Sequence, residues 1–152
     1  MTRLDAPMTA PPSPAPSSIS YIRPAMGLIA GLGITALITG PGIIMATLAM
    51  LRGVGDPRGF QPTTANLLVY LAIIACGALA GGVATARITT GRSFYTVFLL
   101  GSVLFMSAMV VVLRGDTSAQ ARPRWYSISQ AVIVLFAVLL GGYIERRRNP
   151  AP

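Results

Sequence analysis

The stretch that most constrains the fold is Asn66–Ile88, which reads NLLVYLAIIACGALAGGVATARI. The residues between Asn66 and Arg87 carry no charge, and the second half of the run consists almost entirely of small side chains. An uncharged apolar run of this length predicts a helix that crosses a membrane. Its small residues predict close contact with neighbouring helices, because two backbones approach closely only where side chains are small.

The composition of the whole chain favours the same class. Among 152 residues, 53% are apolar and only 11% are charged, well below the charged share of an ordinary soluble domain. All 12 basic residues are arginine, and the net charge is +8. In a soluble domain this excess would suggest nucleic acid. Here the arginines lie between apolar runs, so we expect contact with membrane lipid and no nucleic-acid partner.

The apolar runs predict one all-α membrane protein, with four transmembrane helices packed as a small antiparallel bundle. Residues 1–20 are rich in proline and serine and are predicted to form a disordered tail. Residues 21–148 form the four-helix transmembrane domain, and residues 149–152 a short tail. The predicted spans are 25–51, 66–86, 94–113 and 127–144.

The first predicted span is unusually long. As a straight helix it would measure roughly 40 Å, more than the roughly 30 Å of a hydrocarbon core. Tilt is one way to absorb the excess. The second is a break at Gly40, Pro41 and Gly42, because proline has no N–H to donate to the preceding turn. Pro24 suits the first turn of this helix.

Small residues at helical spacing predict the packing faces. In the first span Gly27, Gly31 and Thr35 recur every four residues, which favours a helix contact over a transport path. Cys76 is expected to be a small packing residue of the second span. The full set of predicted packing residues is Gly27, Gly31, Thr35, Gly77, Ala78, Gly81, Gly82, Ala86, Gly141 and Gly142. Trp125, Tyr126 and Tyr143 are predicted to anchor the chain at the membrane–water boundary.

An echo links the second and fourth spans. Gly81-Gly82 followed by Arg87 recurs sixty residues later as Gly141-Gly142 followed by Arg147. The echo fits a duplicated two-helix hairpin, and it equally fits chance, since glycine and arginine commonly end spans.

The sequence offers no catalytic, cofactor-binding or metal-binding residue. It contains no histidine, which removes the commonest general base and a common metal ligand. The four acids, Asp5, Asp56, Asp116 and Glu145, fall in predicted tails, loops or span ends. No predicted span therefore contains an ionisable residue of the kind that ion or proton transport uses. We expect that the protein is not an enzyme and has no cofactor.

Residues from about Ala75 to Arg147 resemble a group of small, uncharacterised bacterial four-helix membrane proteins. The shared motifs are Gly81-Gly82-x-x-x-Ala86-Arg87, Leu100-Gly101, Pro123-x-Trp125-Tyr126 and Leu139-Leu140-Gly141-Gly142. Members often carry a histidine at the start of the third helix, where this chain has Ser93-Phe94-Tyr95. The resemblance implies the four-helix architecture and implies no activity.

The resulting expectation is a non-enzymatic, multi-pass accessory protein that packs against a partner membrane protein or against itself. The alternative is a small transporter or channel component that uses the break at Gly40–Gly42. The expected location is the inner membrane of a bacterium. Seven arginines on the side of the termini, against five on the other side, favour both termini in the cytoplasm.

Overall fold

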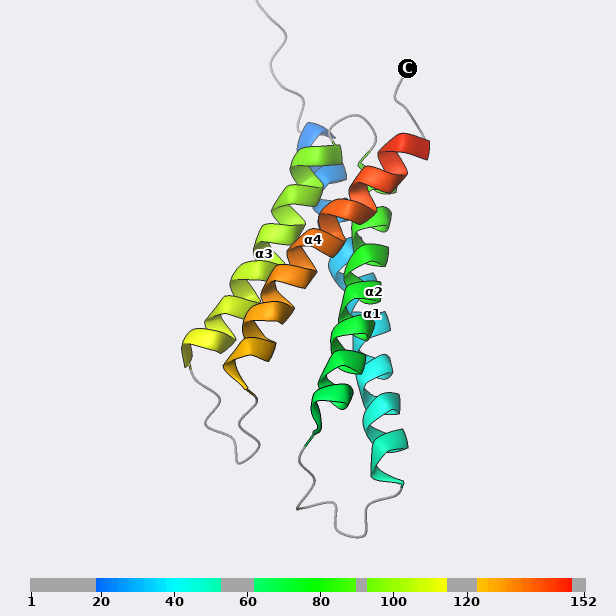
Figure 1. Ribbon diagram of the computed structural model, residues 1–152. Helices are drawn as coiled ribbons and strands as arrows, with labels where there is room; N and C mark the ends of the chain where they lie inside the picture. The colour runs from blue at the N-terminus through cyan, green and yellow to red at the C-terminus, as the bar shows by residue number, and fades with distance from the viewer. Residues whose placement is uncertain (1–18, 53–61, 90–92, 115–122, 149–152) are drawn as a thin grey trace, which may run out of the picture.

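The computed structural model describes residues 19–52, 62–89, 93–114 and 123–148, and the regular elements in these ranges are all α-helices. In chain order they are α1 (Ile19–Leu51), α2 (Thr64–Ile88), α3 (Ser93–Arg114) and α4 (Arg124–Arg148). They run alternately in opposite directions, so the start of α1 and the end of α4 lie at the same end of the molecule (Figure 1). The predicted fold class, four antiparallel apolar helices, is confirmed.

All four helices are long and apolar enough to cross a membrane. α2 has 25 residues, about 37 Å at 1.5 Å per residue, which exceeds a hydrocarbon core of roughly 30 Å. Large apolar side chains point outward on every helix, as at Leu37, Leu113 and Phe136. Such a surface is unfavourable in water and favourable in lipid. The structure is therefore compatible with a multi-pass membrane protein.

The pair α2–α4 forms the middle of the bundle, with α1 packed along α2 and α3 packed along α4 (Figure 1). α3 also touches α2, so α2 has neighbours on three sides. Two clusters of buried side chains hold this arrangement, and within the described ranges neither takes a buried residue from α1. The larger consists of Ile74, Ala78, Ala86, Val97, Leu100, Val134 and Val138. The smaller consists of Leu67, Tyr70, Leu71 and Tyr126.

The predicted break in the first span is wrong. α1 continues as a single helix of 33 residues through Gly40, Pro41 and Gly42. Proline removes one N–H donor from the helix, but the remaining backbone hydrogen bonds outweigh this loss where lipid offers no other partner. Pro24 also lies inside α1 rather than in its first turn, because the helix begins five residues earlier. The transporter alternative thus loses the broken helix on which it relied.

Helix ends differ from the predicted span ends. α4 begins at Arg124 and continues to Arg148, beyond the predicted boundaries at 127 and 144. Ile19 and Ser20, predicted to belong to the tail, are helical. α2 begins after Thr63, whose side-chain oxygen accepts the Asn66 N–H at 3.4 Å as an N-cap. The rest of the predicted tail, the loop acids Asp56 and Asp116, and residues 149–152 lie outside the described residues.

Candidate functional site: helix interfaces and a buried ion pair

The glycines near the start of α1 lie against the end of α2. A Cβ atom added to Gly27 would overlap the methyl group of Thr89 and lie 3.5 Å from the carbonyl oxygen of Thr85. One added to Gly31 would overlap the Thr85 hydroxyl and lie 3.1 Å from the carbonyl oxygen of Gly81. The overlap at Gly27 is with a side chain, whereas Gly31 also lies tightly against the backbone of α2, so a larger residue at position 31 would push the two helices apart.

The same contact continues along both helices. A Cβ atom on Gly81 would overlap the Thr35 hydroxyl and lie 2.7 Å from the Gly31 carbonyl oxygen. One on Gly77 would overlap the hydroxyl of Thr39 and lie 3.2 Å from the Thr35 carbonyl oxygen. The Thr39 hydroxyl is buried here without a hydrogen-bond partner. The stripe on α1 and the glycines on α2 therefore meet face to face.

Glycines also bring α2 and α4 together. A Cβ atom on Gly82 would overlap the carbonyl oxygen of Val138 and lie 3.0 Å from the carbonyl carbon of that residue. A Cβ atom on Gly141 would overlap the carbonyl oxygen of Leu79. The two helices thus cross with backbone against backbone, each helix contributing one glycine. Neither contact can be relieved by moving a flexible side chain.

The other predicted packing residues lie on the same inner surfaces. A Cβ atom on Gly142 would lie 2.6 Å from a methyl group of Val97, so this glycine faces α3 rather than α2. Ala78 and Ala86 are both buried in the larger core cluster. Gly42, predicted to be part of a helix break, instead faces Ile73 of α2.

Hydrogen bonds reinforce the contact between α1 and α2. The Thr85 hydroxyl lies 2.9 Å from the carbonyl oxygen of Gly81 in its own helix and 3.1 Å from that of Gly27 in α1. The Thr89 hydroxyl donates to the Thr85 carbonyl at 2.7 Å. Thr85 is fully buried, and its shared donor satisfies a hydroxyl that lipid could not solvate.

A buried carboxylate lies near the end of α4. Glu145 Oε1 accepts a hydrogen bond from Arg87 Nε at 3.0 Å, and the two side chains are 6% and 63% exposed. Glu145 therefore lies inside the helix α4, one residue beyond the predicted end of the fourth span at 144. A signal existed in the sequence, because Glu145 follows Gly141 and Gly142 at helical spacing and so shares their inward face.

Exposed arginines surround this ion pair. The start of α1 and the ends of α2 and α4 lie together at one end of the molecule, which we call the arginine end (Figure 1). Among the described residues there, Glu145 is the only acid. The described arginines of this end are Arg23, Arg87, Arg146, Arg147 and Arg148, all of them exposed.

The three predicted interface anchors have different positions. Trp125 and Tyr143 are 42% and 51% exposed, and the Arg147 guanidinium carbon lies 5.7 Å from the centre of the Tyr143 ring. Tyr126 is only 1% exposed and belongs to the smaller core cluster, so its prediction as an anchor is wrong. Its ring meets that of Trp125 edge to face at 6.1 Å. Tyr126 is buried because it enters α4 one residue after Trp125 and points about 100° away.

Cys76 was expected to pack among small residues, and this prediction is wrong. Its side chain is exposed, whereas the next residue, Gly77, is buried against α1. The thiol therefore lies on the outer surface of α2, on the side that would face lipid in a membrane. Within the described ranges, no three His, Cys, Asp or Glu side chains gather into a group that could hold a metal ion.

These features define a class of protein: a four-helix, membrane-compatible bundle with close glycine interfaces and, among the described residues, one half-buried ion pair at its arginine end. Comparison with known proteins adds no narrower assignment, since no family model, no curated protein and no solved structure matches the chain.

Proposed function

We propose that this chain is a non-enzymatic accessory protein of a bacterial inner membrane, which binds a transmembrane helix of a partner membrane protein through the outer face of α1. The single observation that carries the proposal is the position of Gly33 and Gly40. Both are exposed, and a Cβ atom added to either would meet nothing within 4 Å. These two glycines therefore have no packing role within the bundle.

The two glycines lie on one face of α1. They are seven residues apart, which is two helical turns, and the exposed Ala36 lies between them. The remaining glycines of α1 differ, because Gly27, Gly31 and Gly42 all face α2. An unpartnered glycine costs a helix about 1 kcal/mol relative to alanine. A second helix that approached this face closely would recover that cost in packing.

The position of α1 supports the same proposal. It contributes no buried apolar residue to either core cluster within the described ranges, and large side chains such as Ile29 and Leu37 are more than two-thirds exposed. We place both termini in the cytoplasm, because the arginine end carries more described arginines than the opposite end, which has Arg52, Arg114 and Arg124. The resemblance to bacterial four-helix proteins supports the inner membrane.

The test is a photo-crosslinking residue at Ala36 in the full-length chain, activated in native membranes. We expect one adduct of defined mass that contains a single copy of this 15.9 kDa chain and one partner protein. The double substitution Gly33→Leu with Gly40→Leu should abolish the adduct while leaving the unfolding transition in place, because both positions open onto free space. A crosslinker at Val111 of α3, which is equally lipid-facing, is the matched control.

Three outcomes would contradict the proposal. An adduct of two identical chains would show self-association instead of an accessory role. Adducts of the same yield from positions 36 and 111 would show random encounter in the membrane. An adduct that survives the double leucine substitution would place the partner elsewhere.

A further inference from the structure

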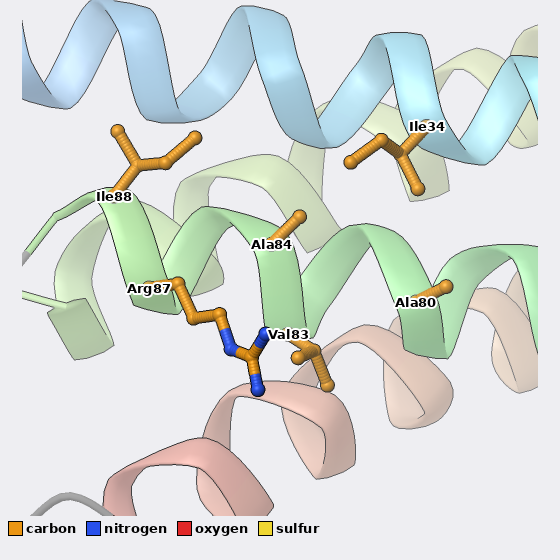
Figure 2. A pocket seen from close by; sticks show the side chains of 6 residues that line it. All are labelled: Ile34, Ala80, Val83, Ala84, Arg87 and Ile88. Carbon is orange, nitrogen blue, oxygen red and sulfur yellow. The ribbon is translucent and has the colours of Figure 1, made fainter.

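A groove of about 430 Å³ runs along α2, with α1 on one side and α4 on the other (Figure 2). Ala80 and Ala84 form its floor, and their small side chains leave the space that larger residues would fill. In Figure 2 the ribbon of α1 lies on one side of these residues and that of α4 on the other. The residues that line the groove are Ile34, Ala80, Val83, Ala84, Arg87 and Ile88.

The groove is apolar along its length and charged at one end. Arg87 lies one residue from the end of α2, and its side chain extends toward α4 in Figure 2. The apolar part of α2 below it, from Leu67 to Ala86, spans about 30 Å, which matches a hydrocarbon core. Arg87 therefore lies at the depth where lipid phosphates are found. Ala80 lies about 10 Å deeper, at the level of acyl chains.

The Arg87 guanidinium is held in place and still offers donors. Its Nε donates to Glu145 at 3.0 Å, which fixes the orientation of the side chain. The side chain nevertheless remains 63% exposed. An arginine carries five N–H donors in a rigid planar group that suits phosphate oxygens. The ion pair thus holds the guanidinium toward α4, at the edge of the groove, and leaves most of its donors available.

The charge around the groove selects the kind of occupant. Arg146, Arg147 and Arg148 follow Glu145 at the end of α4, and all three are exposed. Among the described residues of this end, the single acid already pairs with Arg87. A positive surface at phosphate depth attracts anionic headgroups over zwitterionic ones.

We propose that this groove is a binding site for one anionic glycerophospholipid, with the phosphate on the Arg87 guanidinium and one acyl chain along Ala80 and Ala84. The site lies mainly on α2, with Ile34 of α1 at its edge, and includes neither Gly33 nor Gly40, so this proposal and the proposed partner contact are tested separately. One arginine near the surface should favour phosphatidylglycerol over phosphatidylcholine about fivefold.

The experiment uses full-length protein in vesicles of phosphatidylcholine and phosphatidylglycerol, with either lipid brominated so that it quenches tryptophan on contact. Cys76→Trp combined with Trp125→Phe gives a single tryptophan one helical turn below Ala80, on the exposed side of α2. Val103→Trp combined with Trp125→Phe is the matched control, because Val103 is exposed in the middle of α3, far from the arginines at the helix ends. We expect the roughly fivefold preference for phosphatidylglycerol at position 76 and none at position 103.

Three substitutions, each added to the Cys76→Trp, Trp125→Phe protein, distinguish lipid binding in the groove from a general attraction of anionic lipid to the positive surface. Ala84→Leu fills the floor and keeps every charge, Arg87→Gln removes the proposed phosphate ligand, and Arg146→Gln removes an equal charge outside the groove. The preference for phosphatidylglycerol over phosphatidylcholine should disappear in Ala84→Leu and in Arg87→Gln. It should remain about fivefold in Arg146→Gln. The proposal is overturned if Ala84→Leu has no effect, if Arg146→Gln acts as strongly as Arg87→Gln, or if inorganic phosphate displaces the lipid preference.

Discussion

The crossing of α2 and α4 gives the sharpest test of the fold, through the substitution Gly82→Ala. The added methyl group would overlap the Val138 carbonyl oxygen and lie 3.0 Å from both the carbonyl carbon and the Cα atom of the same residue. Carbon atoms in contact prefer about 3.5–4.0 Å. The two helices must therefore separate by at least about half an ångström, since backbone atoms cannot rotate aside.

This separation sets the size of the effect. A gap of about 0.5–1 Å removes roughly a quarter to a half of the dispersion attraction across a contact, and overpacking a close interface typically costs about 1–3 kcal/mol. Alanine also favours helix over glycine by about 1 kcal/mol, which opposes the loss. We expect Gly82→Ala to lower the free energy of unfolding by up to about 2 kcal/mol.

A matched control variant cancels the contribution of helix propensity to the stability difference. Gly33→Ala makes the same chemical change on α1, where the new methyl group meets nothing within 4 Å. It should raise stability by up to about 1 kcal/mol, so the two variants should differ by the overpacking cost alone, about 1–3 kcal/mol. The comparison requires detergent-solubilised protein unfolded by increasing sodium dodecyl sulfate, with helix content followed by circular dichroism. Equal stabilities for the two variants would refute the close-crossing argument.

The double variant Gly82→Ala with Gly141→Ala extends the test. Gly141 approaches the Leu79 carbonyl from the opposite helix, so both substitutions push the same pair of backbones apart. Once one methyl group has separated the helices, the second has less to displace. The combined loss should therefore fall short of the sum by at least about 0.5 kcal/mol. Strict additivity would mean that the two glycines lie in separate contacts.

Two further predictions concern polar groups. The hydroxyls of Thr47 and Tyr70 lie 2.9 Å apart. In a double-mutant cycle of Thr47→Val and Tyr70→Phe we expect a coupling of about 0.6 kcal/mol in the unfolding free energy. A coupling of zero would show that this hydrogen bond contributes nothing. Arg87→Met should destabilise the protein by about 3 kcal/mol, because it removes a partner from a carboxylate that is only 6% exposed. Glu145→Gln should cost about 1 kcal/mol or less, since the released arginine is largely exposed. Similar losses in these two variants, measured by the same unfolding assay, would contradict the burial argument.

The existence of four helices was predictable because each apolar run is longer than any element except a transmembrane or fully buried helix. Helix ends were less predictable, since charges mark the limit of the apolar run and not the limit of helical hydrogen bonding. Glu145 and the three arginines after it were expected to stop the fourth span, and they lie inside α4. Pro41 was expected to interrupt α1, although lipid gives the backbone no alternative partner.

The direction in which each side chain points was harder to predict than the helices themselves. Neighbours along a helix point about 100° apart, so composition alone does not separate Cys76 from Gly77, or Trp125 from Tyr126. In each pair the structure places the first residue outside and the second inside. The glycine sets were easier, because spacings of four residues keep side chains on one face whatever the rotation of the helix.

The sixty-residue echo between α2 and α4 does not place equivalent glycines in equivalent contacts. Where these two helices cross with backbone against backbone, the close glycines are Gly82 and Gly141, which are not sixty residues apart. Their sixty-residue counterparts differ, because Gly142 faces α3 and Gly81 faces α1. The positions that packing does not dictate are more informative. Thr85 and Glu145 are also sixty residues apart and both are buried, but the first bonds backbone carbonyls of α1 and α2 and the second pairs with Arg87. The outer helices differ as well, since α1 meets α2 through glycine and threonine while α3 meets Gly142 of α4 through Val97. The repeated residues thus make different contacts in the two helices, and the chemistry around them belongs to each hairpin separately.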